Sequence, residues 1–235
     1  MELQSEGHCV FCNEYFSQKE IGRHLATHLK AKEKEDKGKQ AVFFNHIMVE
    51  ADVMFLHLLV RSTCEMEEID NFLRAIWLEC CGHESGFHIK RGEEIEMDEI
   101  VGDVLPPKTK IQHDYDCGTT TRTSIKSIKV YDLDFDDDDI ILLSRNEPLK
   151  IMCSSCNNKT ATVLCSVCIW DGESFFCKTC AKKHAKTCED FDDYASMDVV
   201  NSPRMGECGY EGGTFDTERD GVYKERKKIT SPKTK

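Results

Sequence analysis

The middle of the chain carries the clearest pattern of hydrophobic and polar positions. Between residues 66 and 80 apolar side chains recur at steps of three and four, which is typical of an amphipathic helix. The apolar positions of this stripe are Met66, Ile69, Phe72, Leu73, Ile76, Trp77 and Cys80. The apolar run 54–60 predicts a buried strand, and residues 110–115 and 124–131 predict two strands joined through a turn at 116–118. A helix on antiparallel strands predicts an α+β fold.

Changes in composition along the chain predict four regions. They are a Cys2His2-like ββα zinc finger with a charged linker (1–40), an α+β domain (41–150), a two-zinc Cys/His module (151–190), and a loop segment with a basic tail (191–235). The mixed-charge run 30–37 has no apolar stripe, so we expect a helix extension that frays into a linker.

Composition narrows the class of protein. No apolar run approaches the ~20 residues of a membrane span, and the N-terminus lacks the pattern of a secretory signal. The net charge of −12 argues against a general nucleic-acid coat. We therefore expect a cytoplasmic protein that does not bind membranes, in which the closely spaced cysteine pairs among its 14 cysteines bind zinc and do not form disulfides.

The first cysteine pair belongs to a finger motif. Cys9 and Cys12 are followed by His24 and His28, which share a helix face, and this is the Cys2His2 pattern. The gap from Cys12 to His24 is one residue shorter than the usual spacing of about twelve. Phe16 and Ile21 are expected to form a miniature core. If the finger reads DNA, its helix would use Lys19 and Arg23, but residues 1–40 hold seven basic and seven acidic side chains. A protein-contact or purely structural role is the alternative.

A second group of eight metal ligands lies between residues 153 and 188. The ligands are Cys153, Cys156, Cys165, Cys168, Cys177, Cys180, His184 and Cys188, enough for two tetrahedral zinc sites. Sequential pairing would join the first four and the last four ligands. In the cross-brace pairing the first and third pairs share one metal, and the second pair shares the other with His184 and Cys188. The eight-residue spacings favour the cross-brace. With the finger, we predict three structural zinc ions.

Two parts of the sequence resemble known families. Residues 73–87, with Tyr-Asp-Cys-Gly-Thr-Thr-Thr at 115–121, resemble the Ri-plasmid ORF-three-like family, which is associated with plasmids and mobile elements. Cys117 stands where that family has Phe, and Arg122 where an acidic residue is usual. The resemblance covers roughly residues 41–145, and implies an α+β fold without an established activity. The spacing at 153–188 is similar to B-box zinc modules, although Cys188 replaces a histidine.

These observations favour a non-enzymatic, zinc-binding adaptor or interaction protein whose zinc modules contact macromolecules. Trp170 and Phe175, between two cysteine pairs, are candidate partner anchors. One alternative is a mobile-element or regulatory DNA-binding protein that uses residues 1–40 and the basic tail. Another alternative is an enzyme that uses Cys80, Cys81 and His83. For these three residues, however, we expect packing in the protein core ahead of a metal, redox or nucleophilic role. We identify no catalytic residue and no small-molecule substrate. The role of residues 201–210 is left open.

Overall fold

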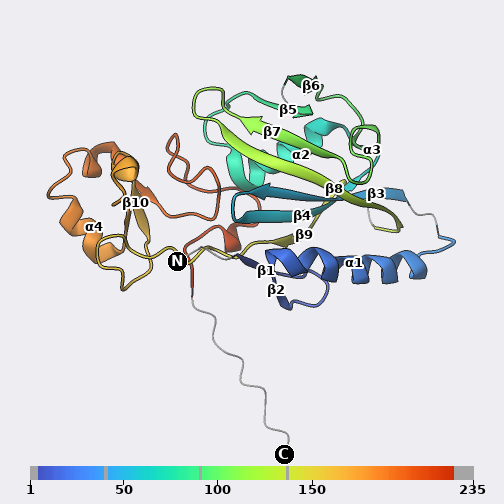
Figure 1. The fold of residues 1–235 in the computed structure, drawn as a ribbon, viewed down its shortest axis with the longest axis horizontal. Helices are drawn as coiled ribbons and strands as arrows, with labels where there is room; N and C mark the ends of the chain where they lie inside the picture. Colours follow the sequence, from blue (N-terminus) through green and yellow to red (C-terminus); the bar gives the residue numbers. More distant parts are fainter. Residues whose placement is uncertain (1–4, 40–41, 90–91, 136–137, 225–235) are drawn as a thin grey trace, which may run out of the picture.

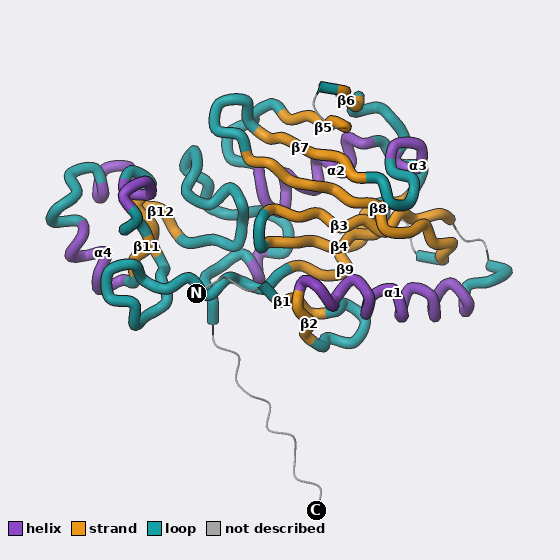
Figure 2. The backbone as a smooth tube through the Cα atoms, viewed as in Figure 1, coloured by secondary structure: helices purple, strands orange, loops and turns teal. Residues whose placement is uncertain are grey.

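The computed structural model describes residues 5–39, 42–89, 92–135 and 138–224, apart from the side chains of residues 170 and 171 (Figure 1). Its largest element is a seven-stranded antiparallel sheet in the order β6-β5-β7-β8-β3-β4-β9. The strands are β3 (Val42–Ala51), β4 (Met54–Arg61), β5 (Ser85–Ile89), β6 (Glu93–Ile95), β7 (Lys110–Tyr115), β8 (Thr121–Leu133) and β9 (Ile140–Arg145). The predicted α+β class, with a large antiparallel sheet and few helices, is confirmed (Figure 2).

One face of the sheet is covered by the predicted amphipathic helix. The helix α2 (Met66–Leu73) continues as the π-helical turn η1 (Arg74–Leu78), and α3 (Val101–Val104) packs beside it. Ile69, Leu73 and Trp77 are fully buried against Ile47, Leu58 and other strand residues. The helical residues end at Leu78, so Cys80 leaves the stripe and lies in the loop before β5.

The opposite face is covered by the N-terminal segment. The hairpin β1 (Glu6–His8) and β2 (Tyr15–Ser17) leads into α1 (Gln18–Glu35). Ile21, Leu25 and Leu29 recur every four residues and are fully buried on the sheet, in one cluster with Phe44, Phe55, Leu59 and Leu143. At Gly22 an added Cβ would lie 3.1 Å from the ring of His57, so helix and sheet are in close contact. The expected miniature core is therefore wrong in part, because Ile21 packs on the sheet.

The charged run 30–37 also contacts the sheet. A carboxylate oxygen of Glu33 accepts a hydrogen bond from Lys129 Nζ at 3.1 Å, and the other accepts from the backbone N–H of Asp132. The buried carboxylate of Asp36 accepts from the N–H of Asp134 and pairs with Lys32 and Lys39. The prediction of a fraying linker is wrong for residues 30–36, since these acidic side chains fix the helix end to β8.

A smaller lobe stands beside the sheet (Figure 1). It holds β10 (Val163–Cys165), η2 (Cys168–Asp171), β11 (Phe175–Phe176), α4 (Lys178–His184), η3 (Phe191–Ala195) and β12 (Ser196–Asp198). The strands form a three-stranded sheet in the order β11-β10-β12. Half of the eight buried residues in its main core are cysteines, namely Cys153, Cys165, Cys177 and Cys180.

After β12 the chain returns to the large sheet. The fully buried guanidinium of Arg145 donates to the carbonyl of Asn201 at 2.7 Å and pairs with Asp220. Asn146 and Asn201 exchange hydrogen bonds, and Ser202 Oγ donates to the carbonyl of Trp77 at 2.6 Å. We call residues 199–222, with the turn η4 (Thr217–Arg219), the return segment. Residues 201–210 are thus a docked part of the fold.

Candidate metal centres

The first group of ligands joins the N-terminal hairpin to α1. Cys9 and Cys12 lie in the turn between β1 and β2, and His24 and His28 lie one turn apart on α1. Their four ligand atoms lie within 4.8 Å of one another. Phe16 stacks on His24 with ring centroids 3.9 Å apart, and Phe11 stacks on His28 at 5.2 Å. These rings fix the imidazoles toward the cysteines, so the group could hold a metal ion.

The eight ligands at 153–188 form two further groups. Cys153 and Cys156 lie with Cys177 and Cys180, and each ligand atom is within 4.8 Å of the others. The second group joins Cys165, Cys168, His184 and Cys188 within the same limit. The structure therefore has the cross-brace grouping, with the first and third cysteine pairs together, and not the sequential one. Either group could hold a metal ion.

Backbone hydrogen bonds favour the ionised form of two of these thiols, Cys153 and Cys177, whereas burial and neighbouring thiols raise the pKa of Cys168 to about 12 and that of Cys180 to about 11. Burial opposes ionisation of Cys153, but backbone N–H groups of Cys177, Cys156 and Ser155 outweigh it and lower its pKa to about 6. The pKa of Cys177 is lowered chiefly by the backbone N–H of Cys180. Metal ions bind thiolates, so donors arranged in this way prepare the sulfurs for a cation. The Nε2 atom of His184 is buried without a hydrogen-bond partner, as a metal-binding nitrogen would be.

A fourth group includes three residues for which sequence analysis ranked core packing ahead of a metal role, and one residue that it did not assign. Cys80, Cys81 and His83 follow η1, and Cys208 comes from the return segment; their ligand atoms also lie within 4.8 Å of one another. Core packing is therefore wrong for Cys81, which is exposed, and only partly right for the half-buried Cys80. A vicinal cysteine pair with a nearby histidine was a visible signal, but no spacing rule reaches Cys208, more than 120 residues away.

The other predicted site residues occupy different surroundings. Lys19 and Arg23 are exposed on α1, away from its buried stripe. Phe175 is half-buried and lines a cavity between the lobe and the sheet. The side chain of Trp170 lies outside the described residues, as do residues 225–235 of the basic tail. In the part of the chain that is described, no helix is both long and apolar enough to cross a membrane.

Comparisons with known proteins leave the family open. No protein-family model matches the chain, and no curated protein does. Among solved structures, a protein of unknown function from Methanosarcina mazei Go1 is similar with a TM-score of 0.38 and 10% identity, over 45% of this chain and 69% of that one. A similarity at this level supports no functional inference. The resemblance to the Ri-plasmid ORF-three-like family stays a prediction.

Proposed function

We propose that this chain is a zinc-binding, non-enzymatic interaction protein in which zinc ions fix small modules to an α+β sheet domain. The observation that carries the proposal is the convergence of four cysteine and histidine ligands in each of the three groups that the sequence motifs predict. Thiolate and imidazole are the ligands of structural zinc, whereas calcium and magnesium take oxygen ligands.

The separations between sulfur atoms support a tetrahedral ion. Zinc–sulfur bonds of about 2.3 Å place the sulfurs of a tetrahedron about 3.8 Å apart. The Sγ atoms of Cys156 and Cys177 are 4.0 Å apart, and those of Cys165 and Cys188 are 3.9 Å apart. A disulfide would require about 2.05 Å, and all 14 cysteines are free thiols in the structure.

The complete ligand sets favour a structural role for the metal. A catalytic zinc ion keeps one position open for water or substrate, whereas each of these groups offers four protein ligands. Because no coordination position is open for a substrate, the modules can contact other molecules only through their surfaces. An interaction with another macromolecule is therefore the best-supported use of the modules.

Replacing Cys12 by serine tests the proposal. Native mass spectrometry of the full chain should show zinc in the wild-type protein and one ion fewer in the variant, because Cys12 supplies one ligand of the first group. Cys117→Ser is the matched control, since this exposed cysteine belongs to none of the four groups. A wild-type protein purified with zinc present but carrying none would contradict the proposal.

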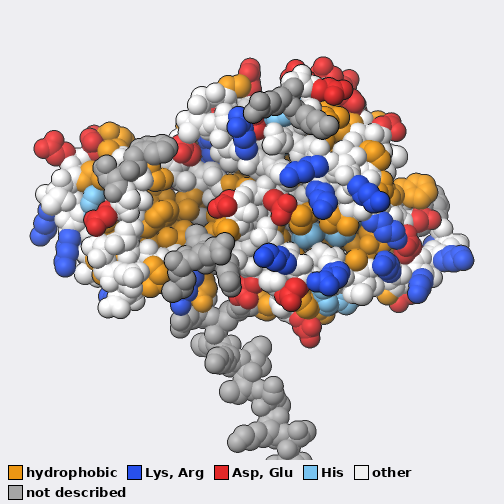
Figure 3. Space-filling model, viewed as in Figure 1, with side chains coloured by type: hydrophobic (Ala, Val, Ile, Leu, Met, Phe, Trp, Pro, Cys, Tyr) orange, Lys and Arg blue, Asp and Glu red, His pale blue; other side chains and the backbone are white. Residues whose placement is uncertain are grey.

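The outer face of α1 favours nucleic-acid binding as a second candidate function. Lys19, Arg23, Lys30 and Lys34 are exposed, and helical geometry places them within about 60° of one another around the helix. Glu33 and Asp36 instead point to the sheet and pair with Lys129 and with Lys32 and Lys39. Four basic side chains of α1 therefore share one exposed face, while Glu20 and Glu35 are exposed at other positions around the helix. Figure 3 shows lysine and arginine gathered on the side that carries α1.

This second function predicts salt-dependent binding to duplex DNA. Fluorescence anisotropy should show weaker binding by Lys19→Ala/Arg23→Ala, with the slope of log affinity against log salt reduced by about 2. The control variant Lys182→Ala/Lys183→Ala removes the same charge from the exposed face of α4. No binding at low salt, or equal losses in both variants, would remove the helix from a nucleic-acid role.

A further inference from the structure

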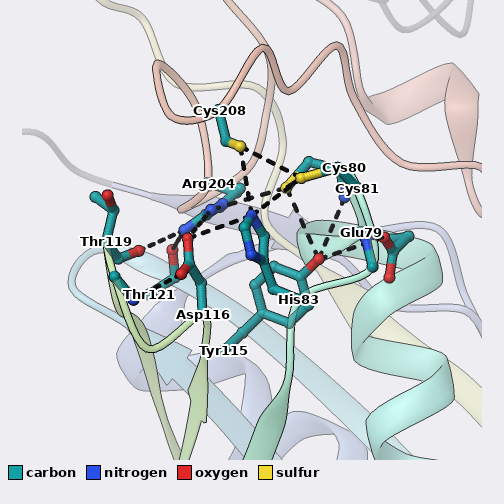
Figure 4. Close-up of polar contacts among 12 residues, drawn as sticks. Glu79, Cys80, Cys81, His83, Tyr115, Asp116, Thr119, Thr121, Arg204 and Cys208 are labelled. Carbon is teal, nitrogen blue, oxygen red and sulfur yellow. Dashed lines mark hydrogen bonds and ion pairs between the residues drawn. The ribbon is translucent and has the colours of Figure 1, made fainter.

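Four ligands from distant parts of the chain converge beside the end of η1 (Figure 4). The Sγ of Cys208 lies 3.4 Å from the Sγ of Cys81 and 3.3 Å from the Nε2 of His83. Cys81 Sγ and His83 Nε2 are 3.1 Å apart, and the Sγ atoms of Cys80 and Cys81 are 3.9 Å apart. No pair is close enough for a covalent bond, yet all four atoms surround one point.

We propose that Cys80, Cys81, His83 and Cys208 form a fourth zinc site, whose ion fastens the return segment to the sheet domain. Three thiolates and one imidazole are a complete tetrahedral zinc set. The sulfur separations of 3.4 and 3.9 Å fit the roughly 3.8 Å edge of such a site far better than a disulfide. This inference rests on the proposed zinc-binding function, but it concerns ligands that no sequence motif contains.

The surroundings of Cys80 suit a negatively charged metal site. Zinc with three thiolates and a neutral imidazole carries a net charge of −1, which a nearby cation stabilises. The fully buried Arg204 provides that cation: its Nη2 lies 3.7 Å from Cys80 Sγ. The Tyr115 hydroxyl also lies 3.7 Å from this sulfur. Arg204 donates to the sulfur, and hydrogen bonds of this kind orient metal ligands.

Arg204 also links the site to the turn after β7. Its Nη2 pairs with the carboxylate of Asp116, while its Nη1 donates to the carbonyl of Thr119 and, at 3.2 Å, to Thr121 Oγ1 (Figure 4). Asp116 has a left-handed backbone, with φ of 71°, which turns the loop toward the arginine. The return segment is thus held at one point by Arg204 and, four residues further from β12, by the ion on Cys208.

The proposed ion would also determine the shape of a cavity. A cavity of about 440 Å³ lies between the turn at residues 119–122, Phe175 of the lobe, and Ser202, Met205 and Glu207 of the return segment. Its return-segment wall ends one residue before Cys208. Losing the ion would therefore free the end of this wall, while Arg145 and Asn201 keep the rest of the segment in place.

The fourth site is more open than the other three. Each of the others has a cysteine with no exposed surface, at Cys9, Cys153 or Cys165, whereas none of the four ligands here is classed as buried. A chelator can reach Cys81 and Cys208 directly, because both are exposed. We expect this zinc ion to leave first and to return when zinc is supplied.

Cys208→Ser in the full chain tests the site, with Cys81→Ser as a second variant and Cys117→Ser as control. Under reducing conditions, native mass spectrometry should count four zinc ions in the wild-type and control proteins and three in either test variant. On titration with a chelator, the first ion released by the wild-type protein should be missing from Cys208→Ser. Hydrogen exchange should rise at residues 205–210 in that variant and stay unchanged at residues 66–78.

The possible failures are distinguishable. Three ions in the wild-type protein and three in Cys208→Ser would overturn the fourth site and leave the proposed function standing. A disulfide between Cys81 and Cys208 in the reduced wild-type protein would also overturn it. No zinc in any of these proteins would instead overturn the proposed function itself.

Discussion

Replacing Cys177 by serine is expected to remove two zinc ions from the chain, although Cys177 is a ligand in only one group. The two groups of the lobe interleave, since Cys165 and Cys168 lie between the two cysteine pairs of the other site. Loss of the ion on Cys177 frees the end of β11 and the start of α4, and α4 also carries His184 of the second group. Zinc supplies ~10–16 kcal/mol in small zinc modules.

Apart from the metal groups, the lobe has a three-stranded sheet and two small apolar clusters. Four of the eight buried residues in its main core are themselves cysteine ligands, and the remainder are Phe176, Ala181, Phe191 and Ala195. We expect limited proteolysis to cut Cys177→Ser within residues 151–198 and to spare the sheet domain, which has two separate apolar cores. Cys117→Ser should keep its zinc and resist cleavage. A Cys177→Ser protein that loses one ion and still resists cleavage would show that the two sites are independent.

Leu25→Ala is expected to lower the free energy of unfolding of the whole sheet domain by about 2–5 kcal/mol. Leu25 has no exposed surface and lies in the same cluster as Phe44, Phe55 and Leu59 of the sheet. Truncating it leaves a cavity between α1 and the strands, and not inside a self-contained finger. Denaturant unfolding followed by circular dichroism, with zinc in excess, measures the change.

Lys30→Ala is the control for this substitution. Lys30 is exposed on the same helix, so its replacement should change the free energy by no more than about 0.5 kcal/mol. If Leu25→Ala left the unfolding midpoint of the sheet unchanged and only loosened residues 5–39, the finger would be an independent module. If the finger is instead part of the sheet domain, the face of α1 that carries Leu25 is buried on the strands and cannot contact another molecule.

Local patterns predicted elements with one covered face, and also β4, whose continuous apolar run marks a strand that is covered on both faces. The helix at 66–78 and strand β7 show the expected periods because one side of each meets the core and the other meets water. Strand β3 is also covered by α1 on one face and α2 on the other, but it was not predicted because the polar Asn45 and His46 interrupt its apolar residues. The fold accommodates the buried Asn45 because its side-chain amide donates a hydrogen bond to the carbonyl of Leu105 at 2.7 Å.

The metal ligands also divide into those that local sequence patterns identify and those that depend on the tertiary fold. Spacing identified every ligand of the first three groups, because each cysteine pair lies in one short turn. Spacing favoured the cross-brace pairing at 153–188, which the structure has, but left the sequential pairing open because the pairing depends on how β10 and β11 fold together. Cys208 was beyond any local rule, since the docking of Arg204 on Asp116 and of Asn201 on Asn146 brings it to Cys81.

Anomalous diffraction from crystals of the full chain, recorded on either side of the zinc absorption edge, tests the central claim most directly. The account predicts one zinc peak in each of the four groups, surrounded by the sulfur and nitrogen atoms that converge there. Crystals grown with zinc present that show no zinc peak at the first three groups, or that show disulfides within them, would contradict it.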